Sequence, residues 1–196
     1  MTTMLVINGS PRKLGNTETV LNAFVEGAKE AGAEVTVVRL VEIDHKNCKG
    51  CNACHKNGVC VLKDDLTPVF DQMLQSDILV LASPIYSMSV TAEMKSFIDR
   101  GQFLWAQKFI RKTLVFDAEH LKKHKGVFLG TSGQDLPYIF DSAFPVVRAF
   151  FNDSGFSYAE NVLFPGMDQH GGVHNWPESV VEAKKRGKEI AQSMQG

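Results

Sequence analysis

The chain has 196 residues, of which 44% are hydrophobic and 22% charged, and its formal net charge at pH 7 is −1. Its length and composition suit a globular protein with a well-buried core. The near-neutral charge gives no bulk attraction to nucleic acid or to an anionic membrane, so we expect neither as a partner. The first apolar run is short and follows no basic region, so we predict no signal peptide and a cytoplasmic protein.

Five apolar runs along the chain predict β-strands. The first, MLVINGS, predicts a buried strand that stops at Gly9 and Ser10, and EVTVVRLV predicts a β-branched second strand. The other three predicted strands cover residues 77–84, 125–133 and 158–166.

Helical spacing of apolar residues predicts helices between these strands. Apolar residues from Val20 to Ala28 recur on one face of a helix that begins near Thr17. Pro145 lies inside a later helical pattern and predicts a break or kink, whereas Pro177 opens the last helix. The later predicted helices cover residues 66–76, 91–105, 138–156 and 177–194.

Continuous apolar strands that alternate with helices predict an α/β fold with a mainly parallel sheet covered on both faces. No repeat or linker divides the chain, so we expect one domain over residues 1–196. Residues 42–64 form an irregular, cysteine-rich insert after the second strand. Residues 104–125 mix apolar and basic side chains without clear periodicity, which fits a surface excursion or a subunit contact.

The loop GSPRKLGNT, between the first strand and the first helix, is rich in groups that bind phosphate. Ser10 and Thr17 offer hydroxyls, Asn16 an amide, and Arg12 and Lys13 positive charge. The helix start adds free backbone N–H groups and a positive dipole end. The loop matches neither a Walker loop nor the dinucleotide G-x-G-x-x-G spacing. A helix cap at Asn16 alone would not explain the two cations, so we predict a phosphate site.

Three segments together resemble a known family. GSPRKLGNT is similar to the phosphate loop of the flavodoxin-like NAD(P)H-dependent FMN reductases. SPIYSMSVTAEMKSFIDR resembles their second flavin loop and following helix, and GTSGQD their third loop. The resemblance covers nearly the whole chain in order. It implies an open five-stranded parallel sheet with strand order 2-1-3-4-5, and FMN bound noncovalently at the switch point between the first and third strands.

The resemblance also implies which residues bind FMN. The first loop would hold the phosphate through Ser10, Arg12, Asn16 and Thr17, with Lys13 and Gly15 beside them. The second loop would border the ribityl chain and ring through Pro84, Ile85, Tyr86, Ser87 and Met88. The third would approach the polar edge of the ring through Thr131, Ser132 and Gly133. Core packing of the tyrosine and an ordinary turn in the third loop are the alternatives.

All four cysteines lie in the segment CKGCNACHKNGVC. Cys48, Cys51 and Cys54 are spaced so that three thiolates can wrap one corner of a small cluster, and Cys60 reaches it after a short loop. Bacterial ferredoxins use a similar run, but proline follows their fourth cysteine where this chain has Val61. Zinc sites usually join two cysteine pairs across a long spacer, and these four cysteines are too close in sequence for that arrangement. A reducing cytoplasm disfavours a disulfide.

The cysteine segment resembles the insert of the iron–sulfur flavoprotein branch of the same family, in position, in spacing and in the following VLKDDLTPVF. There, four cysteines bind a 4Fe–4S cluster, which implies as ligands here Cys48, Cys51, Cys54 and Cys60. The alternatives are unligated thiols, an oxidisable switch pair, zinc or a disulfide. Lys49, Lys56 and His55 would add positive charge and lower the pKa values of the thiols, unless they only form a solvated loop face.

A late glycine-rich segment is the last candidate site, and the sequence shows no pattern of a catalytic triad. DQHGGVHNW, residues 168–176, has too few ligands for a metal site and predicts a flexible loop over the flavin of its own or a neighbouring subunit. No Ser-His-Asp order or nucleophile elbow is present. We therefore expect no catalytic side chain, because flavin N5 accepts the hydride.

The resemblance and the loops together predict an FMN-dependent oxidoreductase. We expect NAD(P)H or a reduced carrier protein to reduce FMN, and a 4Fe–4S cluster, where present, to pass electrons to an acceptor or redox protein. One alternative is a cluster-free NAD(P)H-dependent reductase of quinones, azo compounds or free flavin. Another is a non-catalytic carrier like the strongly acidic flavodoxins, which the net charge of −1 disfavours. The resemblance further implies a homodimer or homotetramer.

Overall fold

The structure is a computed structural model that describes residues 1–194. Five parallel strands form one sheet in the order β2-β1-β3-β5-β6, and a two-residue β4 (Ser89–Val90) pairs antiparallel with the end of β3. The parallel strands are β1 (Thr3–Asn8), β2 (Glu34–Arg39), β3 (Ile78–Tyr86), β5 (Lys125–Thr131) and β6 (Ser157–Phe164). Counted without β4, the order is 2-1-3-4-5, so the predicted flavodoxin-like α/β fold is confirmed. A strand as short as β4 leaves no alternating pattern in the sequence.

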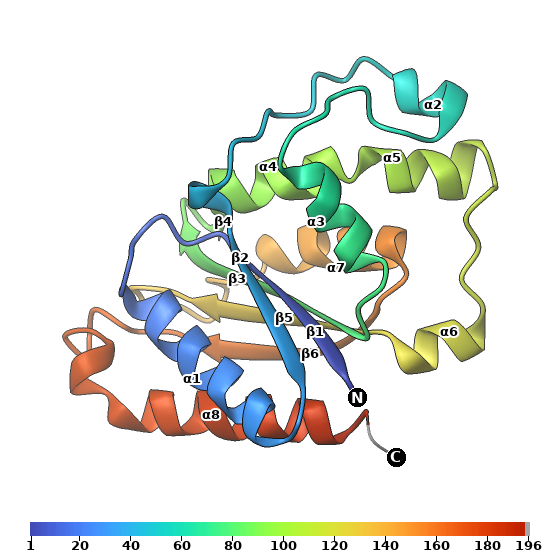
Figure 1. Cartoon of the computed structure of the whole chain (residues 1–196). Helices are drawn as coiled ribbons and strands as arrows, with labels where there is room; N and C mark the ends of the chain where they lie inside the picture. Colours follow the sequence, from blue (N-terminus) through green and yellow to red (C-terminus); the bar gives the residue numbers. More distant parts are fainter. Residues whose placement is uncertain (195–196) are drawn as a thin grey trace.

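Helices cover both faces of the sheet (Figure 1). On one face lie α1 (Asn16–Glu30) and α8 (Pro177–Gln192); on the other lie α3 (Leu66–Met73), α4 (Ala92–Arg100), α5 (Gln102–Trp105) and α7 (Ala143–Ser154). Strand β1 supplies both cores, because successive side chains of a strand point to opposite faces. Met4 and Val6 pack in the core with α1 and α8, while Leu5 and Ile7 pack in the other core.

Short helical segments fill regions that the sequence predicts as irregular. They are η1 (Leu40–Glu42), α2 (Ala53–Asn57), the π-helix η2 (Ala106–Ile110), α6 (Ala118–Lys123) and η3 (Val173–Asn175). The prediction of no regular structure in the cysteine insert is thus wrong for α2, which is one turn bounded by Asn52 and Gly58 in left-handed conformations. Segments this short show no apolar periodicity. No helix within residues 1–194 has the length and apolar content needed to span a bilayer.

Three local predictions about helices differ from the structure. The predicted helix 91–105 is divided at Gly101 into α4 and α5. Pro145 causes no break, because it lies in the first turn of α7, where the N–H that proline lacks has no intrahelical partner. Gly15 rather than Asn16 is the N-cap of α1, so the cap interpretation of Asn16 is wrong.

Two glycines let the backbones of α1 and α8 touch. A Cβ atom on Gly27 would lie 1.9 Å from the carbonyl oxygen of Lys184, and one on Gly187 would lie 1.9 Å from that of Phe24. Any larger residue would force the helices apart. This close contact fixes the position of α1, whose first turn follows the predicted phosphate loop.

Candidate functional site

A cavity of about 450 Å³ opens where β1, β3 and β5 end. Its volume lies within the roughly 300–1,000 Å³ of small-molecule sites, and its place matches the ligand crevice of open α/β sheets. All the predicted FMN-binding residues except Lys13 line it: Ser10, Arg12, Gly15, Asn16, Thr17, Pro84, Ile85, Tyr86, Ser87, Met88, Thr131, Ser132 and Gly133. Lys13 lies outside the cavity wall, with its Nζ 2.9 Å from a carboxylate oxygen of Glu42.

The first loop of the cavity is held by its own side chains. The Ser10 N–H donates to the Asn8 side-chain oxygen at 2.8 Å, and the Leu14 N–H donates to the Glu18 carboxylate. Glu18 in turn pairs with Arg39 of β2, Oε1 to Nε 2.8 Å. The Glu18 carboxylate at the start of α1 would repel a phosphate bound there. Its ion pair with Arg39 offsets that negative charge. The Asn8 Nδ2 is buried beside this loop without a hydrogen-bond partner in residues 1–194.

Side-chain contacts join the first loop to later segments. The hydroxyls of Thr17 and Thr131 are buried and 2.6 Å apart, so they link the first and third loops. The Asn16 side-chain oxygen accepts a hydrogen bond from the Val173 N–H at 3.0 Å. Because that bond uses the oxygen, the amide NH₂ of Asn16 stays available to donate to a ligand.

The second loop is a tight turn between β3 and β4. Ser87 and Met88 both have positive φ, 47° and 70°, as a two-residue hairpin turn of this hand requires. Neither is glycine, and such conformations in larger residues often mark functional sites. Tyr86 before the turn is 42% exposed, so its side chain is not part of the core. The Thr91 hydroxyl donates to the Gly9 carbonyl at 2.7 Å and ties this loop to the first.

All four cysteines line a second, smaller cavity of about 40 Å³, together with residues at the junction of α4 and α5. All four are free thiols, and the Cys54 Sγ lies 4.0 Å from the Gln102 carbonyl oxygen. Within residues 1–194, no three Cys, His, Asp or Glu side chains are close enough to hold a single ion. A 4Fe–4S cluster has a less stringent requirement, because its four thiolates bind four different irons. A cluster therefore requires that the four thiols converge on one cavity, and they do.

The electrostatics of the cysteine segment differ from the prediction at Cys54. Burial, followed by the proximity of the other three thiols, raises the pKa of Cys54. The predicted lowering by Lys49, Lys56 and His55 is wrong for this thiol, because burial and the other thiols determine the direction of its shift. His55 lies against Trp105 instead, with ring centroids 5.8 Å apart.

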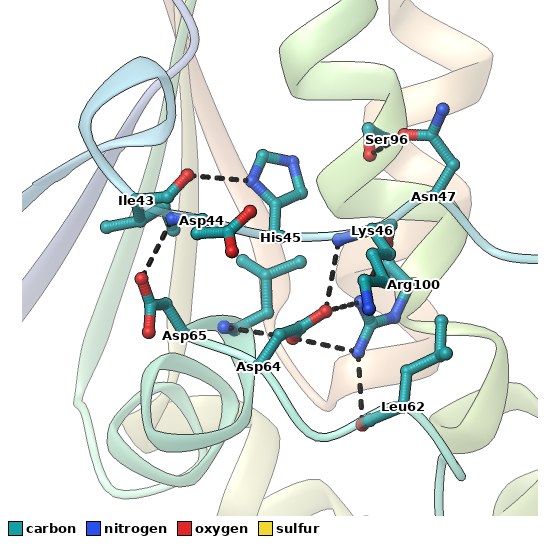
Figure 2. A network of polar contacts seen from close by, with 11 residues as sticks. Ile43, Asp44, His45, Lys46, Asn47, Leu62, Asp64, Asp65, Ser96 and Arg100 are labelled. Carbon is teal, nitrogen blue, oxygen red and sulfur yellow. Dashed lines mark hydrogen bonds and ion pairs between the residues drawn. The ribbon is translucent and has the colours of Figure 1, made fainter.

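One arginine holds the two ends of the cysteine segment together. Figure 2 shows Arg100 of α4 between the chain entering the segment and the chain leaving it. Its NH1 and NH2 lie 2.5 and 3.1 Å from the two carboxylate oxygens of Asp64. NH1 also donates to the Lys46 carbonyl at 2.7 Å, and NH2 to the Leu62 carbonyl at 3.4 Å. We call these four residues the neck of the insert.

The neck is closed further by the carboxylate of Asp64, which also accepts from the backbone N–H groups of Lys46 and Leu66, at 3.0 and 3.2 Å. Burial alone would raise the pKa of Asp64 and lower that of Arg100. Their pairing reverses both effects: the pKa of Asp64 is lowered and that of Arg100 raised, with Cys60 adding to the latter. Both groups are therefore charged at neutral pH.

A family model described as NADPH-dependent FMN reductase matches residues 2–135, which include all three loops of the large cavity as far as Asp135 and the whole cysteine segment. The chain belongs to this family. The resemblance found in the sequence is thereby confirmed, and several curated relatives of the chain are named iron–sulfur flavoproteins.

Two relatives with this name, both from Archaeoglobus fulgidus, show the range of similarity. One is 42% identical over 94 residues, which are 48% of this chain and 43% of that protein. The other is 26% identical over 200 residues and covers 97% of both chains. The first matches span about half the length of the curated relatives. Among solved structures, an FMN-dependent NADH-azoreductase from Bacillus anthracis in complex with FMN superposes with a TM-score of 0.70 at 15% identity. The superposition covers 97% of this chain and 100% of that one, and it shows the shared fold.

Four residues that line the large cavity lie outside the predicted set of FMN-binding residues: Gln134, Ile139, Met167 and Asp168. The last two follow β6, and their N–H groups donate to the carbonyls of Ser132 and Gly133, both at 2.9 Å. The chain after β6 therefore lies along the third loop. The signal was available, because all parallel strands end at the same edge of the sheet. Asp168 opens the segment 168–176, whose role as a loop over the flavin stays a prediction.

The small cavity also contains residues that the sequence analysis missed. Arg100, Gln102 and Phe103 line it from the end of α4 and from α5. No local pattern points to them, since Arg100 ends an ordinary amphipathic helix and lies 36 residues from Asp64.

Proposed function

We propose that this protein is an FMN-dependent oxidoreductase that also carries a 4Fe–4S cluster, built as one domain over residues 1–196. The observation that carries the proposal is the gathering of three separate loops around one cavity of ligand size at the strand ends. The sequence predicts that each loop contacts a different part of FMN. The match to the FMN reductase family supports the same ligand.

The lining of the large cavity fits the chemistry of FMN along its length. Arg12, Ser10 and the N–H groups at the start of α1 would bind the phosphate. The apolar side chains of Ile85, Met88 and Met167 would exclude water from the ring system. Tyr86 would lie along the ring, and the backbone of residues 131–133 would donate to its polar edge. FMN bound here supplies hydride acceptance at N5, so no catalytic side chain is required.

The small cavity fits a cluster through the chemistry of its donors. Cys48, Cys51, Cys54 and Cys60 are soft sulfur ligands that converge on one space. The buried cation of Arg100 lines the same space and offsets part of the negative charge of four thiolates. A bound cluster supplies one-electron transfer. We propose NAD(P)H or a reduced carrier as donor, a small molecule or redox protein as acceptor, and a homodimer or homotetramer as the assembly.

A cluster-free NAD(P)H-dependent reductase of quinones, azo compounds or free flavin is the second candidate. The match to the NADPH-dependent FMN reductase family supports it, because the description of that family names FMN and no cluster. A non-catalytic carrier is the third, and oxidation of NAD(P)H by the purified protein would exclude it.

The deciding experiment is anaerobic purification followed by an absorption spectrum and an assay of iron and acid-labile sulfide. We expect flavin bands together with iron and sulfide. Cys51→Ala should lose the iron and keep FMN, while Val59→Ala, an exposed change in the same segment, should keep both. Flavin without iron would reject the cluster and leave the second candidate. Absence of flavin after incubation with FMN would reject the whole proposal.

A further inference from the structure

Arg100 lines the cysteine cavity although it is neither a predicted ligand nor near the cysteines in sequence. Its side chain is 1% exposed and that of Asp64 is 8% exposed, so the ion pair is shielded from water. Its four hydrogen bonds go to three residues on either side of the cysteines, Lys46, Leu62 and Asp64 (Figure 2). The guanidinium is therefore fixed in place before any ligand binds.

One donor of this fixed guanidinium is unused. The Nε of Arg100 is buried and has no hydrogen-bond partner anywhere in the described chain, residues 1–194. Buried polar groups are nearly always hydrogen-bonded, and an arginine has five N–H donors to satisfy. The contacts to Asp64 and the two carbonyls use NH1 and NH2 only. A buried cation with a free donor at a cavity of four thiols indicates an anionic acceptor in that cavity.

We propose that Arg100 is a positioning residue of the cysteine site, which holds the neck of the insert closed and donates its free Nε–H to an anionic sulfur of the group bound there. This inference rests on the proposed cluster. The acceptor is a thiolate or an inorganic sulfide of that group, and both carry negative charge.

Two measurable consequences follow from this placement. Partners that orient metal ligands typically contribute about 10- to 100-fold in affinity, so loss of Arg100 should weaken retention of iron by this factor. Hydrogen bonds to cluster sulfurs and nearby positive charge stabilise the reduced, more negative state. Removing the donor should therefore lower the reduction potential of the cluster.

A purely structural role for Arg100 predicts a different pattern. An ion pair that only closes the neck would affect the stability of the fold and leave the reduction potential unchanged. Arg100→Lys separates the two roles, because lysine keeps the positive charge and can still reach a carboxylate, but it has no Nε donor in a fixed fork. The potential of Arg100→Lys is thus the decisive measurement.

The experiment compares full-length wild type, Arg100→Lys, Arg100→Gln and Lys95→Gln after anaerobic reconstitution with iron, sulfide and FMN. Lys95 lies on the same helix, is half exposed and pairs with Asp99 at the surface, which makes it the matched control. Measurements are FMN content, thermal stability, iron retained against a chelator, and the cluster potential from a redox titration monitored by electron paramagnetic resonance.

We expect all folded variants to keep FMN, and Lys95→Gln to match wild type throughout. Arg100→Lys should lose iron to the chelator more readily and show a lower potential, and Arg100→Gln should show the larger effect. A folded Arg100→Lys with the wild-type potential would overturn the inference, whatever its iron retention and even if Arg100→Gln fails to fold. Wild type is measured before the variants. Wild type that binds FMN but no iron would overturn the cluster proposal and this inference with it.

Discussion

The large cavity and the cysteine insert are built in different ways. The cavity is formed by loops at the ends of adjacent parallel strands, and the register of β1, β3 and β5 brings those loops together. The insert has no strand, and its two ends are joined by the side chains of Arg100 and Asp64. The cavity thus depends on the sheet, while the insert depends on one buried ion pair.

This difference indicates how each site responds to substitution. A single change in a loop of the cavity leaves the sheet intact and should act on ligand binding. A single change in the neck removes much of what positions the insert and should act on stability and on the cysteines together. The predictions below test this division, from the largest expected effect to the smallest.

Asp64→Ala should be the most damaging substitution in the insert. It leaves the buried charge of Arg100 without its counter-ion and two backbone N–H groups without their acceptor. Removing one partner of a buried pair costs about 3–5 kcal/mol. We expect the free energy of unfolding, measured by urea denaturation, to fall by an amount of this order, with the remaining folded protein still binding FMN.

Asp65→Ala is the matched control for the neck. Asp65 is the next residue, and its carboxylate accepts a hydrogen bond from the Asp44 N–H at 2.8 Å, but this contact is exposed. We expect a loss of no more than about 1 kcal/mol. Equal losses for Asp64→Ala and Asp65→Ala would show that the neck is not the element that holds the insert.

Arg12→Ala should act on the cavity alone. A hydrogen bond to a charged group contributes about 1.5–3 kcal/mol, so the affinity for FMN should fall by about 10- to 100-fold with the iron content and unfolding free energy unchanged. Lys13→Ala is its control, because Lys13 is paired with Glu42 at the surface outside the cavity. Fluorescence titration of the apoprotein with FMN measures both. A larger loss for Lys13 than for Arg12 would contradict this division of the first loop.

The large cavity was largely predictable from the sequence because it forms where the parallel strands end. Apolar runs locate the parallel strands, such strands end at one edge, and loops after strands such as β1 and β3 must meet there. The composition of GSPRKLGNT then predicts a phosphate site. Met167, which lies outside every predicted site, obeys the same rule because it follows the end of β6.

The neck was not predictable because no local pattern encodes it. Arg100 looks like a surface charge at the end of an amphipathic helix, and Asp64 like one of several polar residues in a loop. Only the fold brings them together across 36 residues and buries them. The cysteine spacing identified the ligand candidates but held no information on what positions them.

Gly187→Ala tests the part of the fold that supports the cavity. The added Cβ would meet the Phe24 carbonyl oxygen of α1 at 1.9 Å, a backbone atom that cannot move without shifting the helix. Overpacking of this kind costs about 1–3 kcal/mol. We expect a lower unfolding free energy and weaker FMN binding, with unchanged iron content. Ala183→Gly, a change to the same helix that adds no atom, should leave FMN binding intact, and loss of iron in Gly187→Ala would contradict the separation of the two sites.

Acid should weaken the neck more gently than substitution does. The pKa of Asp64 in the fold lies below its ordinary value of 3.8, because the effect of burial is outweighed by Arg100 and the Lys46 N–H. A carboxyl with a lowered pKa contributes stability that is complete above its ordinary pKa and is lost as the pH falls through the folded-state value. The contribution of Asp64 should therefore persist at pH 5 and above and decline below about pH 4.

The effect of acid should be smaller than that of Asp64→Ala, because a protonated carboxyl keeps its volume and still accepts a hydrogen bond. Unfolding free energies of wild type and Asp64→Asn, compared between about pH 5 and pH 3, isolate this one group. The difference between the two proteins should shrink as the pH falls, since protonation removes from wild type the charge that asparagine already lacks. A difference that stays constant across this range would mean that the charge of Asp64 adds no stability through Arg100. The neck would then be held by the backbone carbonyls alone.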